Sequence, residues 1–304
     1  MRLLLTTASP GFKIAYLFIF LLIGLFIAGA ISQLILLIPI FDRENVLVSL
    51  YVNTISQSIF AIAMPAILIV AWTNSKPLKY LKIRSENGIY KKNVFAVIIF
   101  IFSYVFASFL TLLNKGIALP EWMSGVEEVM RTMEDAALET TDLLLSGRSI
   151  SSLIINIIVI AGLASISEEF FFRGAMQQFI QEKFKNGHVS VWLAALIFSV
   201  VHFQFYGFLP RLFLGAILGY LFLYTKNLWI PILFHFLNNA TVIVVNFFWS
   251  EAEWYKRIED LTINASYILL ALSSLLITVI LFVIYNNRAS KIKNYDTDST
   301  DINI

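Results

Sequence analysis

The chain has no cysteine, only three histidines and few charged residues among its 304 positions. Without cysteine there can be no disulfide, no thiolate metal ligand and no cysteine nucleophile. Charged residues make up 14% of the sequence and hydrophobic residues 59%. Repeated runs of about 20 apolar residues are typical of membrane-spanning helices, and the short alternating segments of a membrane β-barrel are missing. The composition therefore predicts an all-α, polytopic membrane protein.

Hydropathy predicts about eight transmembrane helices. We expect them near residues 13–40, 46–73, 93–114, 149–180, 189–205, 210–225, 229–248 and 265–287. The first could be read as a signal peptide, because Ala28-Gly29-Ala30 resembles a cleavage site. Its apolar run continues to Ile40, however, which is longer than a signal peptide needs, so we interpret it as an uncleaved span.

The charges of the loops predict the orientation. Residues 75–92 hold six basic side chains against one glutamate, whereas residues 121–142 hold seven acidic side chains against one arginine. The positive-inside rule then places the first loop and both termini in the cytoplasm, which an even number of spans allows. We expect the protein in the plasma membrane of a bacterium.

One transmembrane domain is expected over residues 1–287, followed by a polar cytoplasmic tail over 288–304. Within 121–146, apolar residues recur at helical spacing, which predicts an amphipathic helix on the outer membrane interface. A packing or lid role is the simplest interpretation of that helix. The residues that suggest chemistry all fall in a core at 149–248.

Two adjacent carboxylates and an arginine interrupt the fourth apolar run, in the stretch "ASISEEFFFRGAMQQ". Each ionised side chain at the centre of a span costs roughly 2.5–3.5 kcal/mol on insertion scales. Glu169 and Arg173 are four residues apart, so they share a helical face and can form an ion pair. Glu168 is not needed for that pair, and an unpaired intramembrane carboxylate indicates function. Arg173 could alternatively anchor the helix at the membrane interface.

Two of the three histidines also fall within predicted spans. His202 ends the segment "FSVVH", four residues after Phe198, and His235 begins "HFLNN", four residues before Asn239. A lone histidine in a span is commonly a packing residue, but two beside a buried glutamate pair favour a functional site. About the turn at Asn186-Gly187, Glu168 and His202 both lie roughly 22–27 Å of helix away, so they can meet at one depth. His235 lies near the start of its span, which must therefore begin deep or tilt.

Together "EEFFFR", "FSVVH" and "HFLNN" resemble the EExxxR, FxxxH and HxxxN signature of the CAAX prenyl endopeptidase type II family, also called the CPBP or Abi family, of intramembrane proteases. The resemblance covers residues 150–248 and implies that family's intramembrane protease fold. It implies that Glu168 and His202 activate a water, and that His235 and Asn239 donate hydrogen bonds to the oxyanion. Glu169, Arg173 and Phe198 would support these residues from behind.

Other chemistries remain open beside this one. The sequence has no H-E-x-x-H, no G-x-G-D and no G-x-S-x-G, which speaks against the usual zinc, aspartyl and serine proteases. We expect no cofactor, although Glu168, Glu169, His202 and His235 are residue types that suit zinc. A proton-coupled transporter and a non-catalytic bacteriocin-immunity or scaffold protein are the alternatives. The expected partners are the lipid bilayer and a membrane-tethered peptide substrate, not nucleic acid.

Overall fold

The computed structural model describes residues 7–83, 89–255 and 262–300, and the side chains of 89–96 and 285–300 are not described. Parts of the basic loop and of the polar tail therefore lie outside the described residues. Over the described part the chain is 83% helical with no strands, which confirms the all-α prediction. Seven described helices are long and apolar enough to cross a membrane, and the predicted span at 189–205 is a shorter apolar helix, Gly187–Val200.

The helices follow the predicted spans closely. The first two spans are α1 (Pro10–Leu36) and the continuous run α2 (Val46–Ser56), η1 (Gln57–Ala63) and α3 (Met64–Thr73). The label η marks π-helical segments, except for η2, which is a 3-10 helix. The fourth span is another continuous run, made of α7 (Ile150–Asn156), η3 (Ile157–Leu163), α8 (Ala164–Glu169), η4 (Phe170–Gln177) and α9 (Gln178–Phe184). The other elements are α4 (Pro77–Tyr80), α5 (Ile89–Lys115), η2 (Glu121–Met123), α6 (Ser124–Leu145), α10 (Gly187–Val200), α11 (Phe208–Thr225), α12 (Trp229–Trp249) and α14 (Ala265–Thr300). The predicted polar tail is thus helical as far as Thr300.

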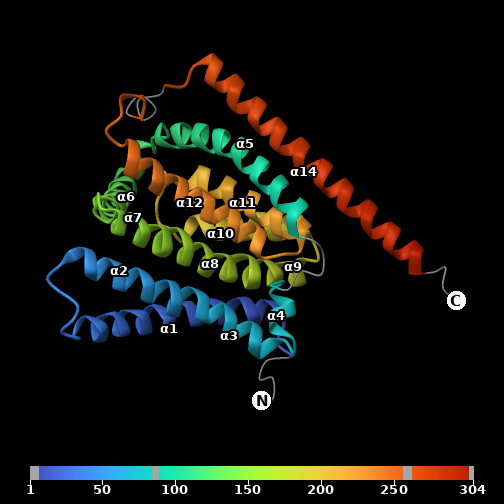
Figure 1. Cartoon of the computed structure of the whole chain (residues 1–304), viewed down its shortest axis with the longest axis horizontal. Helices are drawn as coiled ribbons and strands as arrows, with labels where there is room; N and C mark the ends of the chain where they lie inside the picture. The colour runs from blue at the N-terminus through green and yellow to red at the C-terminus, as the bar shows by residue number, and fades with distance from the viewer. Residues whose placement is uncertain (1–6, 84–88, 256–261, 301–304) are drawn as a thin grey trace.

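The spans are stacked in layers (Figure 1). The long α7–α9 run lies between the α1–α3 pair on one side and α10, α11 and α12 on the other. Beyond α11, α5 packs against it, and α14 packs mainly on α5 at the outside of the bundle. The run that carries the two glutamates is therefore covered by protein on two sides.

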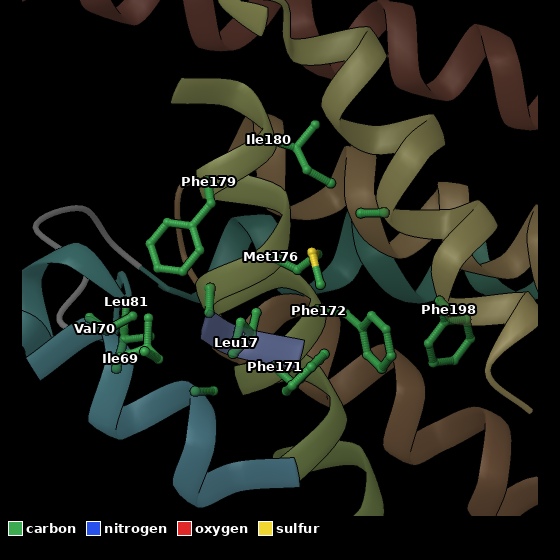
Figure 2. Packing of buried hydrophobic residues seen from close by; sticks show 13 residues of the cluster. Leu17, Ile69, Val70, Leu81, Phe171, Phe172, Met176, Phe179, Ile180 and Phe198 are labelled. Atoms are coloured by element: carbon green, nitrogen blue, oxygen red, sulfur yellow. The ribbon is translucent and has the colours of Figure 1, made fainter. Parts of the chain in front are cut away.

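Apolar side chains of this central run build the main core (Figure 2). Phe171, Met176 and Phe179 are fully buried, and they pack against Leu17 of α1 and Ile69 of α3. Burying a large apolar side chain contributes about 1.5–3 kcal/mol. The core thus fixes the rotation of the central run, and with it the direction in which its polar residues face.

Close helix contact in the first layer depends on one glycine. A Cβ at Gly24 of α1 would collide with the backbone carbonyl of Phe60 and lie 2.8 Å from the Cα of Ala61, both in η1. Ala28, one turn further along α1, is also fully buried. Small residues four apart let helix backbones approach closely in membranes, where packing has to replace the hydrophobic effect.

The start of α12 packs against η4 of the central run. A Cβ at Gly174 of η4 would meet Leu81 at 2.9 Å and Leu228, the residue before α12, at 3.5 Å. The backbone N–H of Leu228 donates to the carbonyl of Lys82, so the segment that contains α4 covers the helix start. His235 is less than two turns from that start. Leu228 meets Gly174, which follows Glu168 by six residues on the central run, and His235 follows Leu228 by seven residues on α12, so His235 reaches the level of the glutamates.

Candidate active site

Glu169 and Arg173 form the ion pair that their spacing predicts. Nη1 of Arg173 lies 2.6 Å from Oε1 of Glu169, and the side chains are 1% and 0% exposed. Nη2 of Arg173 donates to the backbone carbonyl of Gly215 in α11, and the guanidinium lies 4.9 Å from the centre of the Phe198 ring. The alternative role of Arg173 as a membrane-interface anchor is wrong, because the side chain is enclosed between three helices.

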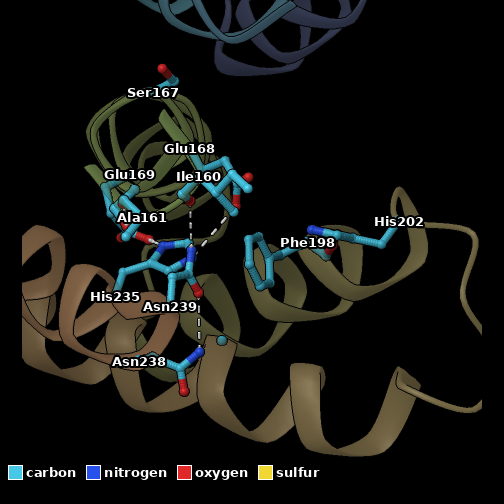
Figure 3. Close-up of polar contacts among 12 residues, drawn as sticks. Ile160, Ala161, Ser167, Glu168, Glu169, Phe198, His202, His235, Asn238 and Asn239 are labelled. Carbon is cyan, nitrogen blue, oxygen red and sulfur yellow. Dashed lines mark hydrogen bonds and ion pairs between the residues drawn. The ribbon is translucent and has the colours of Figure 1, made fainter. Parts of the chain in front are cut away.

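His235 connects the two glutamates (Figure 3). Its Nδ1 lies 2.8 Å from Oε1 of Glu169, and its Nε2 lies 3.8 Å from Oε2 of Glu168. A carboxylate only accepts, so Nδ1 carries a proton, and in the neutral ring Nε2 is an acceptor that faces Glu168. The Glu168 side chain is 17% exposed, whereas Glu169 is 0% exposed. Of the two carboxylates, Glu168 is the one that a substrate could reach.

His202 stands on the other side of the Phe198 ring (Figure 3). The Phe198 ring centre lies 4.9 Å from that of His202 and 5.9 Å from that of His235. Nδ1 of His202 lies 2.6 Å from the carbonyl oxygen of Phe198, so it donates there and leaves Nε2 as an acceptor in the neutral ring. Between described residues, His202 makes no direct hydrogen bond or ion pair with Glu168.

Asn239 lies one turn after His235 on α12. Its Nδ2 is 3.4 Å from the carbonyl oxygen of Ile160, and its Oδ1 accepts from Nδ2 of Asn238 at 3.2 Å. The bond to Ile160 is near the upper limit of length for a hydrogen bond, and the second N–H of the Asn239 amide is not used by it. Asn239 therefore retains a donor for a ligand.

One polar cavity joins these residues. It has a volume of about 290 Å³ and is lined by Glu168, His202, His235 and Asn239 together with residues of α5 and α11. Glu168 and His202, which the turn at Asn186-Gly187 allows to meet, thus line the same cavity. Glu169 and Arg173 are buried and do not line the cavity. Ser167 points away from the site (Figure 3) and donates to the carbonyl of Leu163.

Arg211 of α11 also lines this cavity, and the sequence analysis missed it. It follows Pro210 at the predicted start of a span, where a basic residue is commonly an interface anchor. Its Nη2 donates to Oε1 of Gln204 at 2.6 Å and its Nη1 to the carbonyl of Gln204 at 3.4 Å. No carboxylate of the described residues lies within ion-pair distance of Arg211.

The loop between α10 and α11, residues 201–207, is held from two sides. Asn114 of α5, which is 1% exposed, donates to the carbonyl of Phe205 at 2.9 Å and accepts from the N–H of Leu209 at 2.7 Å. Glu134 of α6 accepts from the N–H of Tyr206 at 3.2 Å. This loop carries His202 at one end and leads to Arg211 at the other, so its position sets the shape of the cavity.

The predicted amphipathic helix is α6, and its charged face reaches the same loop. The guanidinium of Arg131 lies 5.1 Å from the ring centre of Tyr206 and 2.6 Å from Oε1 of Glu127. The hydrogen bond from Arg131 lowers the pKa of Glu127 below its ordinary value of 4.5.

Over the described residues, no group of three or more His, Cys, Asp or Glu side chains is arranged to hold a metal ion.

The described residues include seven apolar helices that could span a membrane, and carboxylate, imidazole and amide groups line a cavity among them, as expected of an integral membrane protein with a polar site. Residues 150–241 match the family described as type II CAAX prenyl endopeptidase Rce1-like. The match covers less than a third of the chain, and it includes the three motifs that resemble this protease family.

Among curated proteins, the chain is similar to the uncharacterized protein YpbD of Bacillus subtilis (strain 168), with 31% identity over 89 residues. That match covers 28% of this chain and 42% of YpbD, so the chain spans less than half of the relative's length. No solved structure matches the chain.

Proposed function

We propose that this protein is an integral-membrane endopeptidase that hydrolyses a peptide bond in a membrane-tethered or hydrophobic polypeptide. The observation that carries the proposal is the contrast between two neighbouring carboxylates. Glu169 is sealed behind the wall by Arg173 and His235, whereas Glu168 opens into a cavity that His202 also lines. A structural ion pair needs only Glu169, so Glu168 is free to act on a substrate.

In the proposed reaction, a water molecule between Glu168 and Nε2 of His202 is the nucleophile. Its oxygen bonds to the scissile carbonyl carbon while one of its protons passes to Glu168. The carbonyl oxygen becomes an oxyanion, and the C–N bond then breaks as Glu168 returns the proton to the leaving amine. Asn239 offers its unused N–H to the oxyanion, and His235 can donate from Nε2 only when both of its ring nitrogens are protonated.

Reconstituted protein provides the test. Wild-type, Glu168→Gln and Ser167→Ala proteins in phosphatidylethanolamine–phosphatidylglycerol vesicles are incubated with a library of synthetic peptides that carry an N-terminal palmitoyl chain. We expect cleavage by the wild type and by Ser167→Ala, whose hydroxyl is bonded within its own helix, and loss of cleavage in Glu168→Gln. Identical product profiles from wild type and Glu168→Gln in mass spectrometry would favour the transporter or scaffold alternative.

We also propose that catalysis is independent of metal. Treatment with a strong chelator should then leave the cleavage rate unchanged. Loss of activity that zinc restores would establish the metalloprotease alternative, in which Glu168 and His235 would be the first ligands to replace.

For orientation, we propose that the α9–α10 turn and both termini face the cytoplasm and that α6 lies outside. The chain has no cysteine, so single cysteines can be introduced without background. Lys185 of the turn and Ser146 at the end of α6 are both exposed. In intact cells, a membrane-impermeant maleimide should label Ser146→Cys but not Lys185→Cys, and the reverse pattern would contradict this orientation.

A further inference from the structure

Arg211 is a cation in the cavity wall for which the proposed reaction has no role so far. A charged side chain within a membrane is costly, and such residues usually pair with an opposite charge. The two hydrogen-bond partners of the Arg211 guanidinium are both on neutral Gln204. Since a guanidinium has five N–H groups, Arg211 retains donors for a further acceptor.

Gly207 lies directly against the guanidinium. A Cβ at Gly207 would lie 2.9 Å from Nη2 of Arg211 and 3.4 Å from its Cζ, so a larger residue there would make the guanidinium shift. Gly207, Arg211 and Glu168 line the same cavity. Glu134 of α6 reaches the loop that precedes Arg211, where it accepts from the backbone N–H of Tyr206.

The transfer of negative charge during hydrolysis indicates a role for the Arg211 cation. When the water adds, Glu168 takes up a proton and loses its negative charge, and the same charge appears on the carbonyl oxygen. A fixed cation that faces the cavity balances Glu168 before the step and the oxyanion after it. In a poorly hydrated cavity such a preorganised charge stabilises the transition state strongly.

We propose that Arg211 is a further catalytic residue of the proposed peptide hydrolysis, and that its guanidinium binds the oxyanion. The inference rests on the proposed endopeptidase function. The positive charge that stabilises the oxyanion then comes from Arg211 on α11, and Asn239 on α12 adds an amide N–H.

The test compares Arg211→Gln with wild type on the palmitoylated peptide that the wild type cleaves fastest. We expect kcat to fall about 10²–10³-fold, as on removal of one oxyanion donor, with KM changed less than about threefold. Arg211→Lys should recover part of kcat. An analogue of that peptide with a phosphinate in place of the scissile amide should lose affinity for Arg211→Gln, because it carries the tetrahedral anion.

Two matched variants separate catalysis from a structural role. Gln204→Ala removes the side-chain acceptor of Arg211 but leaves the backbone carbonyl of Gln204. Glu134→Gln removes a charge beside the loop but keeps an oxygen that can accept from the N–H of Tyr206. Both should lower kcat far less than Arg211→Gln does, and a loss in either one equal to that of Arg211→Gln would overturn the inference by showing that Arg211 only holds the loop or α6. An unchanged kcat with a raised KM in Arg211→Gln would also overturn it.

The Glu168→Gln variant keeps the two proposals distinguishable. If Glu168→Gln is inactive while Arg211→Gln retains its kcat, the endopeptidase proposal stands and the role of Arg211 is wrong. If the wild type cleaves no peptide in the library, both proposals fail together.

Discussion

The buried ion pair between Glu169 and Arg173 makes the strongest quantitative prediction. Replacing Arg173 with Met keeps the apolar stem but leaves Glu169, which is 0% exposed, without its cation. Removing one partner of a buried pair costs about 3–5 kcal/mol, because the remaining charge stays desolvated. We therefore expect the free energy of unfolding of Arg173→Met, measured by SDS titration in mixed micelles, to fall by that amount.

A matched control lies one turn further along the same helix. Nη2 of Arg173 donates to the carbonyl of Gly215, and Nε2 of Gln177 donates to that of Gly219 in the same way. Gln177 is 1% exposed, as is Arg173, but it carries no charge. Gln177→Met should therefore cost only about 1–3 kcal/mol, the penalty for a lost buried hydrogen bond.

The double variant Glu169→Gln/Arg173→Met separates stability from activity. It removes both charges, so most of the lost stability should return, with a coupling energy of about 2–3 kcal/mol in the double-mutant cycle. Cleavage should stay about 10–100-fold below wild type, because His235 has lost the carboxylate that orients its ring. A loss below about 1 kcal/mol in Arg173→Met, or a double variant no more stable than the single ones, would refute this account.

Three further predictions concern the rest of the bundle. Asn114→Ala should lower cleavage and cost about 1–3 kcal/mol in SDS unfolding. The control Ser103→Ala in the same helix, whose hydroxyl bonds to the carbonyl of Phe100, should change neither quantity. Equal effects of the two variants would contradict the role of Asn114. Gly24→Leu should force α1 away from η1 and lower the SDS unfolding midpoint, and an unchanged midpoint would contradict the close approach. Because the pKa of Glu127 is lowered, its pair with Arg131 stabilises the fold at pH values above the ordinary pKa of 4.5, and this stability is lost as pH falls through the folded-state pKa. The SDS unfolding midpoint should therefore drop on acidification less steeply in Arg131→Gln than in wild type.

The sequence predicted most of the helices because the bilayer requires long apolar runs with their backbone bonds satisfied internally. It also predicted the pair of Glu169 and Arg173, since residues four apart on a helix are neighbours whatever surrounds them. Contacts between spans were harder to predict. The bond from His235 to Glu169 joins residues 66 positions apart, and only the packed arrangement of α8 and α12 brings them together.

Residues near the ends of spans escaped prediction for a related reason. Asn114 and Arg211 occupy positions where polar side chains commonly face lipid headgroups and water. Both are instead turned inward, because α5, α10 and α11 meet around the loop at 201–207. Hydropathy measures how apolar a segment is and carries no information on the direction of a single side chain near its end.

The π-helical segments η3 and η4 flank α8 directly, so the short stretch with both glutamates is bounded on each side by turns wider than an α-helical turn. A π turn closes its hydrogen bond one residue later than an α turn, so it stores surplus chain length. Losing a single residue there would rotate the preceding helix by about 100° relative to the next helical segment, while the hydropathy profile would hardly change. The direction in which Glu168 faces around the helix axis thus depends on the number of residues in the π-helical segments. Two relatives with the same hydropathy profile can therefore differ in whether this carboxylate faces the histidines.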